Sequence, residues 1–213
     1  MEAPAVPVRN PPSSYGSGYS YVKHHSEHVH IAMGFPSNPA SLKEMDSVSV
    51  LMAVLGAGTS SRLFQQVREK NALVYSVYST SRNYSDAGYM AAYISCTEKN
   101  VIRSVEETAK VFRGIVDEGL ENGELERTKN LLKGMLSRSA ETTDSRLYRL
   151  CRGYMTYGCA RGIFETLEQL SRVTEEDVMR AAEKFIRADS LNLTVLGTAG
   201  KDVRDFDISS LDL

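Results

Sequence analysis

The side chains best suited to metal chemistry in this sequence are gathered between residues 24 and 30, which contain all four histidines of the chain. His24, Glu27 and His28 follow the pattern H-x-x-E-H. In that pattern two imidazoles bind a zinc ion and the carboxylate activates a metal-bound water. As a motif alone, the segment predicts a self-sufficient zinc hydrolase.

The residues around this motif favour a local structure that zinc could not use. Histidines four residues apart share one metal when they lie on one face of a helix. Here the apolar residues alternate with smaller or polar ones from 27 to 35, which is the period of a half-buried strand. In an extended chain His24 and His28 would lie about 13 Å apart, too far for two ligands each about 2.1 Å from one ion. The sequence therefore predicts no resident metal, and leaves His24, His28 and His30 as adventitious ligands for Zn or Ni.

The elements that would position these and other side chains can be read from the apolar periodicity. We expect one α+β domain over residues 23–200, an antiparallel or mixed sheet with helices packed on one face. Residues 1–22 are rich in Pro, Ser and Gly and are expected to be a flexible linker, with residues 201–213 as a tail. The expected strands are 27–35, 73–80, 88–96 and 191–196, and Asn83, Ser85 and Asp86 mark a turn between the middle two. The expected helices are 38–56 with an Asn38 cap and Pro39 at its first position, 59–70, 101–116, 125–136, 144–157, 163–170 and 174–186.

Composition excludes several classes of function. The 25 basic residues nearly cancel the 27 acidic ones, so no net field favours nucleic acid or an anionic membrane as partner. No apolar run approaches the roughly 20 residues that span a bilayer, and no secretory signal is visible. Cys96, Cys151 and Cys159 are too scattered for a disulfide framework and are expected to be reduced core residues. A soluble protein of a reducing compartment, cytoplasm or mitochondrial matrix, is expected.

A longer pattern resembles a known family. The run from Gly58 to Ser79, GTSSRLFQQVREKNALVYSVYS, is similar to the C-terminal half of M16 metallopeptidases, which include processing peptidases and insulin-degrading enzymes. The likeness covers roughly residues 27–197, and Asn71 and Ala72 stand where the family often has Gly. Its further parts are Tyr84 to Gly88, Glu124 to Arg127, Lys129, Ser145, Arg146, Thr174 and Glu176 to Val178.

The resemblance implies roles for two residues. Arg68 and Tyr75, an R-x6-Y pair, would contact the backbone of an extended peptide near the carbonyl that is cleaved. A guanidinium and a phenol can both donate hydrogen bonds to a developing oxyanion. The alternative for each is ordinary structure: a cation favoured at a helix C-terminus and a tyrosine packed on a strand.

The resemblance also implies where zinc would be. In the zinc-bearing half of the family, the H-x-x-E-H motif lies on the long helix after the first strand. The matching helix of this chain carries Ser47 to Leu51 instead and has no ligands there. The chain alone is therefore expected to be inactive, with zinc on a preceding half or a separate subunit as its partner.

Three hypotheses follow. The first is the substrate-binding half of a zinc metalloendopeptidase. The second is a non-catalytic core or assembly subunit of the same fold, against which the intact Arg68 and Tyr75 pair argues. The third is the self-sufficient hydrolase that would use His24, Glu27 and His28. A homo-oligomer is compatible with each of them.

Overall fold

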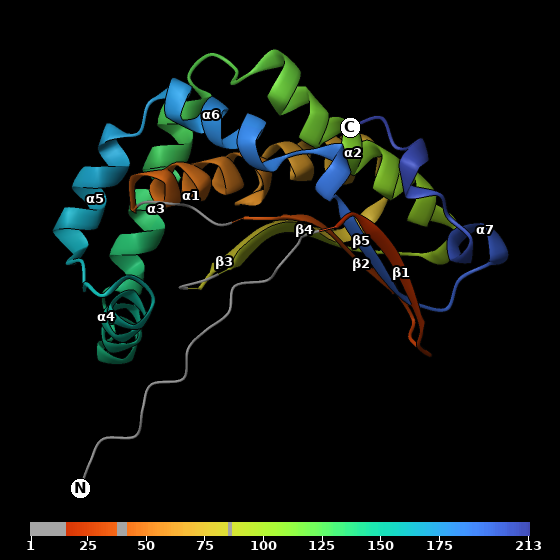
Figure 1. The fold of residues 1–213 in the computed structure, drawn as a ribbon, viewed down its shortest axis with the longest axis horizontal. Coiled ribbons are helices and arrows are strands. Elements are labelled where there is room, and N and C mark those ends of the chain that lie inside the picture. The colour runs from red at the N-terminus through yellow and green to blue at the C-terminus, as the bar shows by residue number, and fades with distance from the viewer. Residues whose placement is uncertain (1–15, 38–41, 85–86) are drawn as a thin grey trace, which may run out of the picture.

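The computed structural model describes residues 16–37, 42–84 and 87–213, and within them five strands form one mixed sheet (Figure 1). The strand order is β1-β5-β2-β4-β3; β1 and β5 are parallel and the other neighbours are antiparallel. The strands are β1 (Gly18–Lys23), β2 (Val29–Pro36), β3 (Val74–Asn83), β4 (Gly88–Cys96) and β5 (Asn192–Gly197). The longer helices are α1 (Leu42–Gly56), α2 (Val101–Glu118), α3 (Glu124–Ser139), α4 (Thr143–Tyr157), α5 (Ile163–Arg172) and α6 (Glu175–Phe185).

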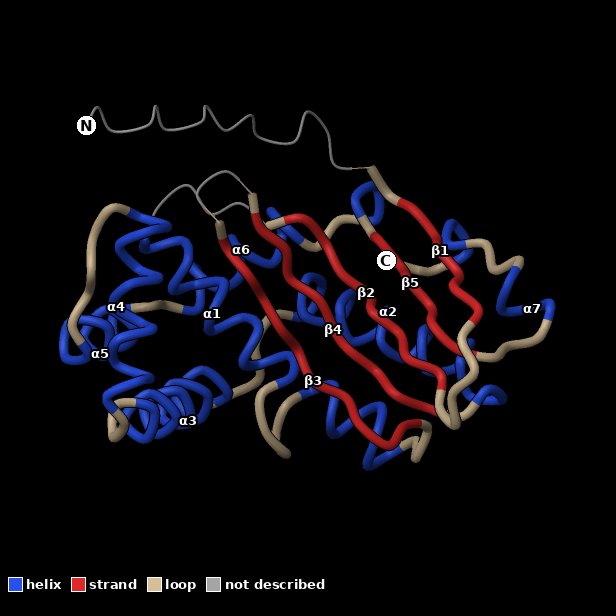
Figure 2. The backbone as a smooth tube through the Cα atoms, turned by 90° about the horizontal axis from the view of Figure 1, so that it is seen from below, coloured by secondary structure: helices blue, strands red, loops and turns tan. Residues whose placement is uncertain are grey.

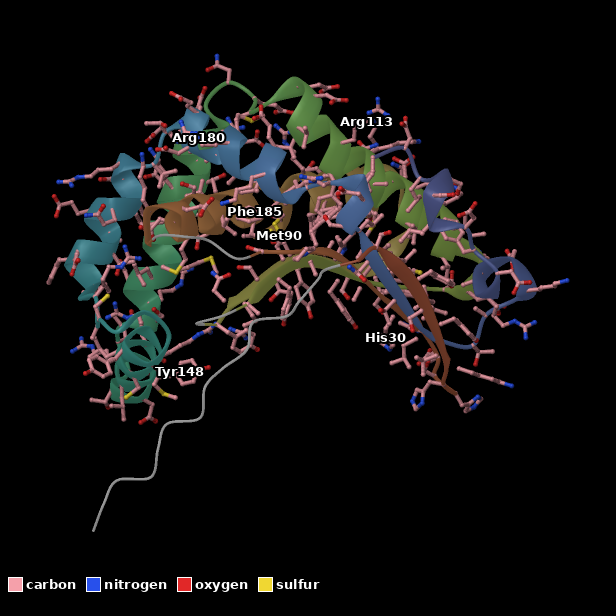
Figure 3. The ribbon with its side chains drawn as sticks, in the orientation of Figure 1. His30, Met90, Arg113, Tyr148, Arg180 and Phe185 are labelled. Carbon is pink, nitrogen blue, oxygen red and sulfur yellow. The ribbon has the colours of Figure 1, made fainter. Side chains whose placement is uncertain are left out.

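Helices α1, α2 and α6 pack on one face of this sheet, α3, α4 and α5 lie beyond its β3 edge, and the other face is left open (Figure 2). Alternation along β2 explains the division: Ile31 and Met33 are buried toward the helices, whereas Ala32 between them is exposed. Figure 3 shows Met90 between sheet and helices and His30 on the opposite face. The expected α+β class, a mixed sheet with helices on one face, is confirmed.

Helix α1 is the centre of the core. Residues 50–55 are all buried, because α1 lies between β3 on one side and α3 and α6 on the others. A helix that is apolar around its whole circumference is expected only in such a position. At its end Gly56 allows the closest approach to β3, since a Cβ there would lie 2.2 Å from the backbone nitrogen of Ser79. This contact fixes where β3 lies relative to the helical layer.

The structure has regular elements on both sides of the expected domain of residues 23–200. Residues 18–22, expected to belong to a linker, form most of β1, whose Tyr21 donates a hydrogen bond of 2.9 Å to the carbonyl of Gly197. The expected tail contains the short helix α7 (Lys201–Arg204), whose Val203 is buried against the core. Pairing with β5 gives residues 18–23 their backbone partners, although all six stay at least partly exposed.

Some expectations fall on residues outside the described ranges. These are the linker at residues 1–15, the cap formed by Asn38 and Pro39, and the turn residues Ser85 and Asp86. Helix α1 itself is described from Leu42, and β3 and β4 pair as the expected hairpin from Val74↔Cys96 to Asn83↔Gly88.

The cysteine prediction holds for one residue of three. Cys96 is buried, and burial raises the pKa of its thiol to about 11, so it stays protonated and behaves as a core residue. Cys151 and Cys159 are exposed, and their assignment to the core is wrong. They belong to the α4 region beyond the edge strand β3, where helical periodicity does not show which face meets the rest of the protein.

Candidate functional site

Arg68 lies near the end of a short helix, η1 (Phe64–Lys70), which the structure forms as a π-helix. Val67 anchors this helix in the core, and Gln66 donates a 2.9 Å hydrogen bond to Glu107 of α2. Hydrogen bonds from Lys110 and Gln66 lower the pKa of Glu107, which keeps it an ionised acceptor for this anchor. The Arg68 guanidinium is exposed and lies over the ring of Phe64, 4.9 Å from its centroid. A fixed helix thus presents a cation at the surface.

The turn from η1 into β3 is strained at Ala72. Its φ is 49°, in the left-handed region that L-residues other than Gly and Asn rarely adopt. The side chain is exposed and carries no packing that would compensate. This is one of the two positions at which the sequence departs from the Gly of its resemblance.

We expect Ala72→Gly to stabilise the chain by about 0.5–1 kcal/mol. Relief of left-handed strain is worth about 1–2 kcal/mol, and the added flexibility of the unfolded chain offsets about 0.4–1 kcal/mol of it. Urea unfolding would measure the difference. Ala188→Gly is the matched control, because Ala188 is also exposed but has negative φ, and it should lose stability. If both variants lost the same free energy of unfolding, Ala72 would not be strained.

Tyr75 is placed on the open face by a β-bulge. Val74 pairs with Cys96 and Ser76 pairs with Ser95, so Tyr75 is the extra residue between two regular pairs. Its side chain is 55% exposed and its ring stacks on that of His28, with centroids 4.2 Å apart and planes 16° from parallel. The bulge and the stack together present the phenol on the side of the sheet that the helices leave uncovered.

A second aromatic row lies beside the first. His30 Nδ1 is 2.6 Å from the hydroxyl of Tyr93, and the Tyr93 ring stacks on Tyr78 at 4.8 Å. Burial raises the pKa of Tyr93, and the neighbouring Tyr78 adds to the shift, so the phenol stays neutral. We call His28, His30, Tyr75, Tyr78 and Tyr93 the aromatic cluster. Sequence reasoning found Tyr75 and noted the histidines, but it missed Tyr78 and Tyr93.

The H-x-x-E-H segment lies in the loop between β1 and β2 and is not helical. The backbone N–H of His24 donates to Gly197 at 3.1 Å, and Ser26 donates through its hydroxyl to the carbonyl of His28 at 2.6 Å. The two histidines of the motif are thus held in different settings, His24 beside β5 and His28 against Tyr75.

Comparison with known proteins places the chain in a family. The family model described as the peptidase M16 inactive domain matches residues 2–132, more than half of the chain. The chain belongs to the M16 peptidase family. A relative named an uncharacterized zinc protease, from Mycobacterium tuberculosis, is 34% identical over 179 residues, which cover 84% of this chain and 41% of the relative. The chain thus spans about two fifths of that M16 protein.

Solved structures agree on the fold. The structure titled peptidase M16 inactive domain from Pseudomonas fluorescens superposes with a TM-score of 0.78 at 20% identity, over 93% of this chain and 48% of that one. A chain of complex III from Candida albicans superposes with a TM-score of 0.74 at 16% identity, over 86% of this chain and 46% of that one. An M16 inactive domain and a chain of complex III therefore share the fold of this chain.

Where the structure describes them, the residues of this M16 chain are not arranged to hold a zinc ion. No group of three His, Cys, Asp or Glu side chains in the described ranges is placed to hold a metal. In α1, where the resemblance would put the zinc ligands, Ser47 and Ser49 turn their hydroxyls to the backbone carbonyls of Lys43 and Met45. The donor set is that of a packed helix and not of a metal centre. Among the described helices, none has the length and apolarity that crossing a bilayer requires.

Proposed function

We propose that this chain is the substrate-binding half of an M16 zinc metalloendopeptidase. Arg68 and Tyr75 contact the backbone of an extended peptide, while zinc held by another half or subunit activates the attacking water. One observation carries the proposal. Within the described residues, neither the exposed Arg68 guanidinium nor the exposed Tyr75 hydroxyl has a hydrogen-bond partner, so both donors are available to a ligand.

The surroundings of Tyr75 suit an extended peptide. Strand β3, which carries Tyr75, is an edge strand of the described sheet, and an edge can pair with the backbone of a peptide of any sequence. The open face beside it offers the rings of the aromatic cluster, which can contact alternate side chains of such a peptide. A domain that binds through the peptide backbone and through its own aromatic rings would accept unfolded segments of varied sequence.

The test is reconstitution. The chain alone should not cleave a mixture of unstructured peptides, whereas a full-length chimera, in which it replaces the matching part of the M. tuberculosis relative, should. A zinc chelator should abolish that activity, and mass spectrometry of the products would report it. Cleavage by the chain alone, with stoichiometric zinc lost on His24→Ala, would instead support the self-sufficient hydrolase.

A second candidate is a non-catalytic assembly subunit, which the fold shared with the complex III chain favours. The exposed Arg68 and Tyr75, whose donors have no partner among the described residues, favour the first proposal instead. If a zinc-bearing partner cleaves peptides at the same rate with and without this chain, the assembly role is favoured over the first proposal.

A further inference from the structure

The ring of His28 reaches Tyr75 across an intervening strand. Val29 pairs with Cys96 on one side of β4, and Val74 pairs with the same Cys96 on the other. His28 therefore approaches from the β2 side and Tyr75 from the β3 side, and their rings meet at a centroid distance of 4.2 Å. The contact joins two residues that lie 47 positions apart in the sequence.

The loop that carries His28 is anchored at several points. His24 bonds through both its backbone groups, donating to Gly197 and accepting from the Thr198 hydroxyl at 3.2 Å. Ser26 fixes the carbonyl of His28 itself. Nδ1 of His28 is buried, which limits the space open to the imidazole, and it has no hydrogen-bond partner in the described parts of the chain. The backbone from which the imidazole of His28 projects is thus fixed just before β2.

Tyr75, in contrast, lies where the strand ladder is interrupted. A bulged residue is left out of regular pairing, and its side chain can be directed to either side of the local bend. More than half of Tyr75 is exposed, so few neighbouring groups restrict the orientation of its side chain. Parallel stacking on His28, with planes 16° apart, selects one direction for the phenol hydroxyl.

We propose that His28 is a positioning residue for Tyr75: its imidazole holds the phenol by stacking, so that the hydroxyl is aimed at the peptide carbonyl before substrate binds. This inference rests on the proposed function, because it assigns Tyr75 a ligand to contact. It also gives the second histidine of the H-x-x-E-H segment a role through its ring plane and not through metal binding.

The experiment uses the reconstituted enzyme and compares His28→Ala, which removes the ring, with His28→Phe, which keeps a ring but no nitrogen. We expect His28→Ala to lower kcat/KM by about fivefold to tenfold, chiefly through kcat. A loss of this size corresponds to the removal of one aromatic stacking interaction. His28→Phe should restore activity to within about twofold, since stacking needs the ring alone. His25→Ala, an exposed histidine of the same loop, is the matched control and should be unchanged.

A double substitution tests whether the effect passes through Tyr75. In a Tyr75→Ala background, His28→Ala should cause no further loss of kcat/KM. If the two losses multiply, or if His28→Phe is as poor as His28→Ala, the positioning role is wrong.

A spectroscopic measurement separates this inference from the proposed function. In the chain labelled at its tyrosine rings, His28→Ala should shift the NMR signals of Tyr75 and His25→Ala should not. Unmoved Tyr75 signals would overturn the positioning role. Shifted signals, combined with turnover that Tyr75→Phe does not affect, would uphold the stack and reject the catalytic use of Tyr75.

Discussion

Tyr75→Phe and Arg68→Ala are each expected to lower kcat of the reconstituted protease about 100-fold, with KM nearly unchanged. In the proposed function both donors act on charge that develops on the peptide carbonyl as water attacks, so their loss should weaken binding of the transition state more than binding of the substrate. Tyr75→Phe removes the hydroxyl alone and keeps the ring that stacks on His28. Its effect therefore reports the donor and not the fold.

Matched controls are available for both variants. Tyr84→Phe removes a hydroxyl from a side chain as exposed as Tyr75, at 55%. Lys70→Ala removes an exposed cation from the same short helix as Arg68. Neither control should change kcat by more than about twofold, and all four variants should keep the thermal midpoint of the parent, since surface changes usually alter stability by under about 0.5 kcal/mol. If Tyr75→Phe and Arg68→Ala both keep the kcat of the parent, the role assigned to the two residues is wrong.

Alternation and helical periodicity were sufficient to predict most elements of the fold. The strand at 27–35 and the long apolar helix ending at Gly56 are predicted from periodicity, and the burial along β2 and α1 agrees with that prediction. The strand β1 is not predicted in this way, because Tyr19, Tyr21 and Val22 follow a run rich in Pro, Ser and Gly, and the strand pairs with β5, which is distant in sequence. Non-local pairing of this kind leaves little local signal.

The candidate site, too, could be predicted from the sequence only in part. Arg68 and Tyr75 could be named from a family pattern, and the histidine segment could be recognised as non-helical from its neighbours. The His28–Tyr75 stack could not be predicted, because it depends on the register of β2 and β3 against β4 and on a bulge at one residue. A shift of one residue would turn Tyr75 to the other face of the sheet.

Glu124 shows a third kind of limit. Glu124 begins α3, and an acidic residue there is favoured by the helix dipole, but this position does not show that the side chain is buried. In the structure its side chain is 9% exposed and accepts two hydrogen bonds from Arg62, at 2.9 and 2.6 Å. Arg62 also donates to the carbonyl of Gly119 at 2.7 Å, and Glu124 accepts from the N–H of Glu121 at 2.9 Å. This network joins the segment before η1 to the turn between α2 and α3.

Removing one partner of this pair should be among the most destabilising polar changes in the chain. Arg62→Ala or Glu124→Gln leaves the other charge buried without its counterion, and we expect a loss of about 3–5 kcal/mol in the free energy of unfolding. Glu126→Gln, two residues away with a side chain 68% exposed, should cost under about 1 kcal/mol. Replacing both partners, Arg62→Met with Glu124→Leu, should cost less than either single change, since no unpaired charge remains.

The same pair sets the expected pH dependence. Burial alone would raise the pKa of Glu124, but the hydrogen bonds from Arg62 and from the Glu121 N–H outweigh it and hold that pKa below its ordinary value of 4.5. A carboxyl with a lowered pKa in the folded state stabilises the fold above its unfolded pKa, and this stability is lost as pH falls through the folded value. Urea unfolding at pH 7 and at successively lower pH should therefore show the gap between parent and Glu124→Gln narrowing as Glu124 of the parent becomes protonated. A gap that stays constant through this range would mean that the ionised pair contributes nothing to stability, and that the loss at pH 7 comes from altered packing at the start of α3.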